Sequence, residues 1–368
     1  MALPENHIKV PSVQISIRQT EAWENDRLPF AVCSDSEVRH LDPDMVLVKT
    51  VAVAINPYDY KMPTQFHSPR TTPGVDFAGI VVCKGSAVSA SIEVGSRVCG
   101  MVGGSNPGDE LMGAFGQYVP AYEHALLRIP KSVSWENAAA LPSAVITIGA
   151  SLFSSSGLGL SVNPESPAQD PFFVLVYGGS TCCGTMAIQL LKQSGLTVVT
   201  TCSPGNFSLV KSYGADEVFD YHSPTCAEDI KAYTKNRLKY VLDVITQART
   251  TQICYSAIGR AGGRYIGLEL INKSFTSGLR RTVDAGWINS LTFLGREVCL
   301  AEGYESKARP DHQAFTKKWL TTAQNLLDNG SLRSHPPRVM PNGFEAVIDS
   351  VERIRRQEVS GQKLVHFI

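Results

Sequence analysis

The sequence of 368 residues contains little charge and no excess of one sign. Only 18% of the residues are Asp, Glu, Lys or Arg, and 34 basic residues balance 34 acidic ones. A neutral chain lacks the basic surface that binds nucleic acids and anionic membranes, and no apolar run approaches the ~20 residues that span a bilayer. The first residues, MALPENHIKVPSVQ, lack the charged and then apolar layout of a secretion signal. We therefore expect a cytoplasmic protein that binds neither nucleic acid nor membrane.

Disulfide and metal-binding patterns are missing as well. The nine cysteines are an odd number, and none of them forms a C-x-x-C pair. Neither a disulfide framework nor a structural zinc knuckle is expected from such spacing. Most of these thiols should be small buried groups in a reducing compartment.

Hydrophobic residues make up 43% of the chain, and their pattern changes along it. The first 150 residues or so contain short β-branched runs between glycines and prolines, which predict strands. Residues 154–171 are rich in Ser, Gly and Pro and predict a surface connection. From 172 to 268, apolar strands alternate with helices, which predicts an α/β fold with a doubly wound parallel sheet.

One predicted strand, 173–177, runs directly into a glycine-rich turn and then a helix. The candidate cofactor-binding residues of this turn are Gly178, Gly179, Ser180, Thr181, Cys182, Cys183, Gly184 and Thr185. Glycines let the backbone approach a pyrophosphate, and a helix N-terminus offers free N–H groups and partial positive charge. The turn does not match G-x-G-x-x-G, so a tight turn without a ligand stays open as the alternative. The order of strand, turn, helix and second strand favours a dinucleotide site.

The end of the next strand favours NADPH over NADH. An acidic residue at this point would bind the ribose 2′-hydroxyl, but the loop consists of Ser203, Pro204, Gly205 and Asn206. A 2′-phosphate is not repelled there, and Ser203 and Asn206 can donate hydrogen bonds to it. No Lys or Arg lies in the loop, so the preference depends mainly on the missing acid.

Motifs across nearly the whole chain resemble the medium-chain dehydrogenase/reductase superfamily. They include VAVAINPYD (51–59), PGVDFAGIV (73–81), GAFGQY (113–118), AALP (139–142) and SGQKLV (360–365). The resemblance implies a GroES-like substrate domain built from both chain ends, with a Rossmann domain inserted. We expect the substrate and catalytic domain in 1–160, the NADPH-binding domain in 161–310, and a return to the first domain in 311–368.

Zinc-dependent members of the superfamily carry a cysteine in the first motif and Gly-His-Glu in the second. This chain has Asn56-Pro57 and Gly74-Val75-Asp76 at those places. Zinc needs three or four convergent Cys, His or carboxylate ligands, so we expect no metal. Asp76 is expected to tie down a turn instead, by accepting backbone hydrogen bonds.

Narrower stretches resemble the trans-acting enoyl reductases that serve fungal iterative polyketide synthases. Among them are INPYDYKM (55–62), TCSPGNF (201–207), GADEVFDYHSP (214–224) and YTKNRLKYVLD (233–243). This resemblance implies a stand-alone, monomeric, NADPH-dependent enzyme. It would reduce the α,β-double bond of a polyketide on the acyl carrier protein of a partner polyketide synthase. Two alternatives stay open: a free quinone or small-enone reductase, and a nucleotide-binding partner of a synthase that has lost catalysis.

The resemblance also implies roles for individual residues near the nicotinamide. Tyr58, Asp59, Tyr60 and Lys61 should border its ribose, and the Lys61 ammonium could hold the ribose or the enolate as a point charge. Thr147 is the second catalytic candidate, near the nicotinamide and the substrate. The alternatives are a solvated surface lysine and a threonine bonded to its own helix.

Further cofactor and substrate contacts are implied by the same resemblance. Tyr221 should stack near the adenine, and Leu268, Val359 and Ser360 should present backbone groups to the nicotinamide amide. Two segments should line the acyl pocket, although they could equally be plain core. They are Thr147, Ile148, Gly149, Ala150, Ser151, Leu152, Phe153 and Ser154, and Ile288, Asn289, Ser290, Leu291, Thr292, Phe293, Leu294 and Gly295.

Overall fold

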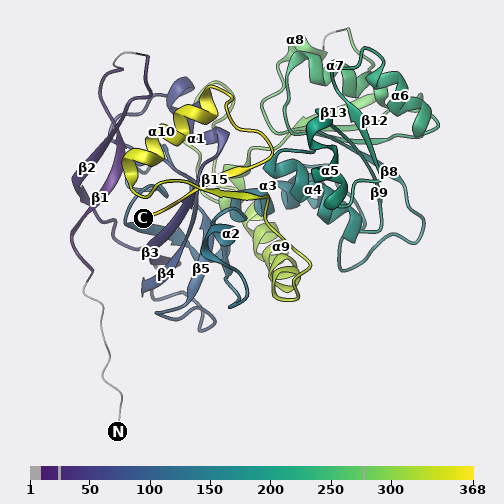
Figure 1. The fold of residues 1–368 in the computed structure, drawn as a ribbon. Helices are drawn as coiled ribbons and strands as arrows, with labels where there is room; N and C mark the ends of the chain where they lie inside the picture. Colours follow the sequence, from purple (N-terminus) through teal and green to yellow (C-terminus); the bar gives the residue numbers. More distant parts are fainter. Residues whose placement is uncertain (1–9, 24–25, 277) are drawn as a thin grey trace.

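Two sheets of different kinds lie side by side in the molecule (Figure 1). The computed structural model describes residues 10–23, 26–276 and 278–368. Residues 1–9 lie outside these ranges. They are most of the N-terminal stretch that lacks the pattern of a secretion signal. One sheet is mainly antiparallel and the other is parallel, which confirms the predicted pairing of a GroES-like domain with a Rossmann-type domain.

The antiparallel sheet belongs to the substrate domain and is built from both ends of the chain. In the described residues its order is β14-β15-β3-β4-β5-β7, and β6 also pairs with β3. The strands are β3 (Met45–Ala54), β4 (Asp76–Lys84), β5 (Arg97–Met101), β6 (Tyr118–Tyr122), β7 (Leu126–Arg128), β14 (Pro337–Val339) and β15 (Lys363–Phe367). A separate hairpin, β1 (Val13–Gln19) and β2 (Phe30–Glu37), flanks this domain. Because β15 pairs with β3, residues near the C-terminus complete the domain to which β3 belongs.

The parallel sheet has the order β10-β9-β8-β11-β12-β13 in the described part of the chain. Its strands are β8 (Phe173–Tyr177), β9 (Thr197–Cys202), β10 (Glu217–Asp220), β11 (Tyr240–Asp243), β12 (Gly263–Gly267) and β13 (Val283–Trp287). The connecting helices are α4 (Cys182–Gln193), α5 (Phe207–Ser212), α6 (Cys226–Tyr233), α7 (Ala248–Ala257) and α8 (Lys273–Thr276). The strand order reverses between β8 and β11, and ligands of such sheets bind in the crevice outside the carboxyl ends of the strands at this point.

The remaining helices cover the substrate domain or lie between the two sheets. They are α1 (Pro57–Gln65), α2 (Trp135–Ala139), α3 (Pro142–Phe153), α9 (Pro310–Asp328) and α10 (Phe344–Arg355), with short 3-10 turns η1 (Glu123–Ala125), η2 (Pro204–Asn206) and η3 (Ser290–Leu294). None of the helices in the described ranges is long and apolar enough to cross a bilayer. Pro142 begins α3 at its first position, where a missing N–H costs nothing.

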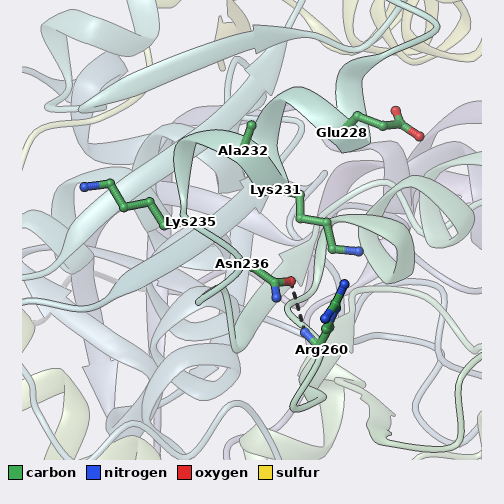
Figure 2. Close-up of a pocket in the computed structure, with 6 residues that line it drawn as sticks. All are labelled: Glu228, Lys231, Ala232, Lys235, Asn236 and Arg260. Atoms are coloured by element: carbon green, nitrogen blue, oxygen red, sulfur yellow. Dashed lines mark hydrogen bonds between the residues drawn. The ribbon is translucent and has the colours of Figure 1, made fainter.

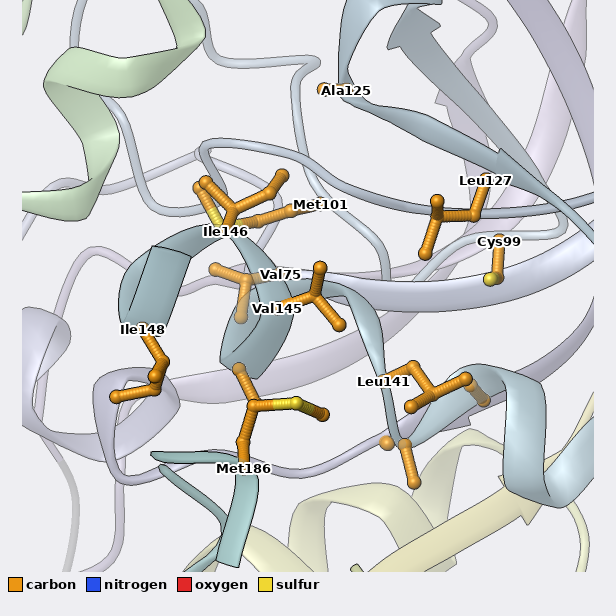
Figure 3. Close-up of a cluster of buried hydrophobic side chains, with 14 of the residues drawn as sticks. Val75, Cys99, Met101, Ala125, Leu127, Leu141, Val145, Ile146, Ile148 and Met186 are labelled. Atoms are coloured by element: carbon orange, nitrogen blue, oxygen red, sulfur yellow. The ribbon is translucent and has the colours of Figure 1, made fainter. Parts of the chain in front are cut away.

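Helix α3 joins the two domains through a continuous hydrophobic core. Figure 3 shows its residues Val145, Ile146 and Ile148 between Met101 of β5 and Met186 of α4, all in one cluster of buried side chains. The strands of the parallel sheet all fall within 161–310, and those of the antiparallel sheet fall outside it. The limits at 160 and 310 themselves remain predictions.

Candidate active site

The turn after β8 has a geometry that only glycine satisfies. Gly178 has a φ of +87°. A Cβ on Gly179 would lie 2.0 Å from Oγ1 of Thr200, and one on Gly184 would lie 2.3 Å from the carbonyl oxygen of Gly178. Thr181 caps α4 by accepting a hydrogen bond from the N–H of Gly184 at 2.9 Å. The N–H groups of Cys182 and Cys183, the first two residues of α4, have no acceptor within the helix, so they are available to bind an anion.

The side chains of this turn have different surroundings. Thr185 is fully buried, and its Oγ1 lies 3.0 Å from Nδ1 of His335, so the predicted cofactor contact is not available to this side chain. Cys183 lines the cleft described below. Burial raises the pKa of its thiol to about 12. The thiol is therefore neutral and is a wall group of the cleft rather than a nucleophile.

Three predicted cofactor residues from distant parts of the sequence meet beyond β9. The amide of Asn206 donates hydrogen bonds to Oγ of Ser203 at 3.2 Å and to Oγ of Ser360 at 3.1 Å. A Cβ on Gly205 would meet no atom within 4 Å. Tyr221 follows β10, where its ring lies 6.2 Å from that of Tyr177. These polar groups lie beside the end of β9, next to the glycine turn after β8.

A cavity of about 190 Å³ lies between the two domains. It is lined by Asn56, Pro57, Tyr58, Lys61, Met62, Val75, Met101, Ser143, Thr147, Cys183, Val244, Leu268, Glu269, Trp287, Ile288, Asn289, Ser290, Leu291, Leu300 and Tyr304. Val244 and Leu268 directly follow β11 and β12, so the cavity opens onto the carboxyl ends of the parallel strands. Both catalytic candidates, Lys61 and Thr147, are among the lining residues. We call this cavity the cleft.

Lys61 lies on helix α1. Asn56 precedes the helix and Pro57 occupies its first position. The side chain of Lys61 is 40% exposed, and its Nζ lies 2.7 Å from Oε2 of Glu269. It therefore reaches from the substrate domain to the nucleotide domain.

Two neighbours of Lys61 on α1 are not free to react. The hydroxyl of Tyr58 donates a hydrogen bond to the carbonyl oxygen of Gly104 at 2.9 Å, and burial raises its pKa. Asp59 is fully buried, and its Oδ2 accepts a hydrogen bond from the N–H of Asn56 at 2.7 Å. The predicted cofactor contact of the Asp59 side chain is therefore wrong, because this carboxyl group closes the first turn of α1. Tyr60 is half-buried and is not among the cleft residues.

The predicted acyl-pocket segments contribute only in part. In the first, only Thr147 lines the cleft. Ile148, Ala150, Ser151 and Leu152 are fully buried, and a Cβ on Gly149 would lie 2.0 Å from Nε1 of Trp319. Phe153 packs against Trp319, and Ser154 bonds back to its own helix. These residues form the core between α3 and α9, so the prediction was wrong for them.

In the second segment, Ile288, Asn289, Ser290 and Leu291 line the cleft, and their contact with an acyl chain stays a prediction. Thr292 and Phe293 instead contact His312 of α9, and Gly295 ends η3 with a φ of +76°. Leu294 lines a smaller cavity of about 40 Å³, to which Leu291 also contributes.

A buried ion pair next to the cleft was missed by the sequence analysis. Oδ2 of Asp76 lies 2.7 Å from Nζ of Lys363, and the side chains are 0% and 3% exposed. The same oxygen accepts hydrogen bonds from Oγ of Ser143 at 2.6 Å and from Nδ2 of Asn56 at 2.9 Å. Burial alone would lower the pKa of Lys363, but the Asp76 carboxylate outweighs it and the pKa is raised.

Asp76 therefore does more than tie down a turn. Oδ1 accepts one backbone hydrogen bond, from the N–H of Ser143 at 2.7 Å, while Oδ2 joins four segments of the chain around one charge pair. Among the described residues, no group of three or more His, Cys, Asp or Glu side chains is arranged to hold a metal ion.

A second cavity, of about 490 Å³, lies on the surface of the nucleotide domain. It is lined by Glu228, Lys231, Ala232, Lys235, Asn236 and Arg260 (Figure 2). Asn236 accepts a hydrogen bond from the N–H of Arg260 at 3.1 Å. None of the predicted site residues lines this cavity, so the cleft between the domains is the candidate active site.

Two family models match the chain in the two domains described above. The alcohol dehydrogenase GroES-like domain matches residues 42–131, and the zinc-binding dehydrogenase family matches residues 182–275. The enoyl reductase CurK has the same fold with a TM-score of 0.73 at 16% identity, covering 96% of this chain and 99% of that one. A quinone oxidoreductase from Coxiella burnetii gives a TM-score of 0.69 at 20% identity, over 96% of this chain and 99% of its own.

Curated relatives are much more similar in sequence. Trans-enoyl reductase ccsC of Aspergillus clavatus is 44% identical over 358 residues, which are 96% of this chain and 97% of the relative. Trans-enoyl reductase mpsG of Macrophomina phaseolina is 45% identical over 351 residues, or 95% of this chain and 98% of the relative. The chain is an oxidoreductase and belongs to the trans-enoyl reductases, a zinc-independent branch of the medium-chain dehydrogenase/reductases.

Proposed function

We propose that this enoyl reductase uses NADPH to reduce the α,β-double bond of a polyketide intermediate carried on the acyl carrier protein of a partner polyketide synthase. The observation that carries the proposal is the composition of the cleft. Cys183, in the first turn of the helix that follows the glycine turn, a partly exposed lysine and an apolar wall meet in one cavity between two domains. The names of the relatives, trans-enoyl reductases, support action on a substrate held by another protein.

The residues near β8 and β9 fit a phosphorylated dinucleotide. The unpaired N–H groups at the start of α4 suit a pyrophosphate. Ser203, Asn206 and Ser360 form one polar group beyond β9, and no carboxylate lies in their loop to repel a 2′-phosphate. This combination supports NADPH rather than NADH.

The residues of the cleft suit conjugate reduction. A bound nicotinamide supplies the hydride. The ammonium of Lys61 stabilises negative charge that develops on the thioester oxygen, as a preorganised cation in a confined site does. Thr147, on α3, also lines the cleft and helps to orient the reacting carbons. Tyr58 keeps its proton, since its hydroxyl is already engaged and burial raises its pKa.

The other walls of the cleft suit an acyl chain. Val75, Met101, Leu291 and Leu300 give an apolar lining that excludes water from the reacting groups. Asn289 and Ser290 add polar groups on the side of η3.

The proposal predicts a strong preference for a carrier-bound substrate. The probe is a crotonyl thioester on the acyl carrier protein of a fungal iterative polyketide synthase, compared with a free crotonyl thioester and a free quinone. We expect kcat/KM for NADPH oxidation to be higher with the carrier-bound thioester by about tenfold or more, equivalent to about 1.4 kcal/mol of transition-state binding.

Faster turnover of the quinone would contradict the proposal and identify a small-molecule reductase. No NADPH consumption with any of the three substrates would contradict it as well, and would leave a nucleotide-binding partner as the remaining function.

A further inference from the structure

An ion pair spans the cleft between residues 208 positions apart in the sequence. Lys61 belongs to α1 of the substrate domain, and Glu269 follows β12 of the nucleotide domain. Their side chains are 40% and 28% exposed, and ion pairs at this exposure contribute little to stability. The importance of the pair therefore lies in where it holds the ammonium group.

The carboxylate of Glu269 is itself held in one orientation. Its Oε2 accepts from Nζ of Lys61 at 2.7 Å, and its Oε1 accepts from the hydroxyl of Tyr304 at 2.5 Å. Burial, together with this carboxylate, raises the pKa of Tyr304, so the hydroxyl remains a donor. With a different donor on each oxygen, the carboxylate cannot rotate without losing a hydrogen bond.

Tyr304 is fixed in turn by aromatic contacts from both domains. Its ring centroid lies 5.4 Å from that of Phe66, at the end of α1, and 5.2 Å from that of Trp287, the last residue of β13. Both contacts are edge-to-face, which is a favourable arrangement for aromatic pairs. On the other side of Glu269, the N–H of Leu268 donates to Oγ1 of Thr246 at 2.9 Å. The backbone before Glu269 and the ring beside it are both anchored.

We propose that Glu269, supported by Tyr304, is a positioning residue that holds the Lys61 ammonium at the wall of the cleft. A lysine side chain has four flexible carbons and three N–H donors. One donor is used by Glu269, which leaves the other two for a ligand in the cleft. The inference rests on the proposed function only for what Lys61 does there, not for the contact itself.

The test combines kinetics with a readout of the contact. Glu269→Gln is made alone and together with Lys61→Ser, and the rate of hydride transfer is measured in single turnovers with NADPH and a small enone. We expect Glu269→Gln to slow this step about tenfold or more while the Kd of NADPH changes less than about threefold. In the Lys61→Ser background it should have no further effect, because Glu269 acts through Lys61.

Two further variants calibrate this result. Tyr304→Phe removes one of the two anchors of the carboxylate and should give a smaller loss of rate. Asp349→Asn breaks a surface pair with Arg27, whose side chains are 67% and 60% exposed, and should change nothing.

The Lys61–Glu269 contact can also be detected without any cofactor or substrate. Lysines are reductively methylated with ¹³C-formaldehyde, and the Lys61 signal in the NMR spectrum is assigned by its loss in Lys61→Ser. We expect this signal to be separate from those of exposed lysines and to join them in Glu269→Gln.

Three results would overturn the proposal: a Lys61 signal among the exposed lysines in the unsubstituted protein, a Glu269→Gln effect that persists in Lys61→Ser, or a loss of rate explained by a loss of folded protein. If the enzyme reduces the small enone but not a carrier-bound substrate, the proposed function is refuted and this inference still holds.

Discussion

At the scale of single residues, buried charges organise the cleft. The Asp76–Lys363 pair is hidden from solvent, yet the two side chains that it holds, Asn56 and Ser143, both line the cavity. Removing one partner of such a pair typically costs about 3–5 kcal/mol, because the other charge is left buried and unpaired. The polar wall of the cleft therefore depends on a charge pair that no substrate touches.

Asp59 gives the protein a pH-dependent stability. Burial, with a smaller contribution from Asp76, raises the pKa of Asp59 to about 8, although the hydrogen bond from the N–H of Asn56 and the charge of Lys363 oppose this. Between pH 4 and 8 the folded state keeps a proton that the unfolded state releases. The contribution of Asp59 to the free energy of unfolding therefore falls as the pH rises through this range.

Asp59→Asn keeps an oxygen that can accept from the N–H of Asn56 but cannot ionise. We expect the free energy of unfolding of the variant, measured with urea, to rise relative to that of the unsubstituted protein by more than about 1 kcal/mol between pH 5 and 8. One pKa unit is worth about 1.4 kcal/mol. Asp349→Asn, at an exposed carboxylate, is the matched control and should show no such trend. A difference in stability that stays constant from pH 5 to 8 would show that Asp59 is ionised in the folded protein.

At the scale of elements, helix geometry explains where the predicted substrate residues were wrong. Successive residues of a helix point about 100° apart, so one face recurs only every three or four positions. Ser143 and Thr147, four residues apart on α3, line the cleft, whereas Ile148 and Leu152 face the core. The sequence motif identified the right helix, but an apolar helix does not by itself reveal which face meets a ligand.

Leu291 on η3 separates the cleft from the smaller cavity beside it, because it lines both. Leu291→Ala should open the wall between them and admit bulkier acyl chains. We expect the ratio of kcat/KM for an α-methyl-branched enoyl thioester to that for crotonyl thioester to rise about tenfold, the usual scale for one or two methylene groups in an apolar pocket.

Leu294→Ala is the control for this change. Leu294 lies on the same turn and is similarly buried, but it lines only the smaller cavity. Both substitutions should cost roughly 2–5 kcal/mol of stability, while only Leu291→Ala should shift substrate preference. An equal shift in both variants would mean that loosening of η3, rather than the opened wall, is the cause.

At the scale of the whole molecule, local signals predicted the parts and distant contacts created the site. The strand, glycine turn and helix around Gly178 are adjacent in sequence, and their pattern was sufficient to predict this strand-turn-helix unit. The contacts that assemble the candidate active site join residues 154 positions apart for Asn206 and Ser360, 208 for Lys61 and Glu269, and 287 for Asp76 and Lys363. Such pairings depend on the strand order of the two sheets, which places distant parts of the chain next to each other. Composition and periodicity do not predict these contacts.

The continuity of the core predicts how the whole molecule responds to its cofactor. One cluster of buried side chains runs from the substrate domain through α3 into α4, so we expect both domains to unfold in a single thermal transition.

A ligand that binds only the folded state adds about 2.7 kcal/mol to the free energy of unfolding at 100 times its Kd. NADPH at that concentration should therefore raise Tm, and NADH at the same concentration should raise it much less, because the loop from Ser203 to Asn206 has no carboxylate for a free 2′-hydroxyl. Scanning calorimetry with each nucleotide measures both effects. Equal shifts would contradict the cofactor preference, and two transitions of which only one moves with NADPH would show that α3 does not couple the domains.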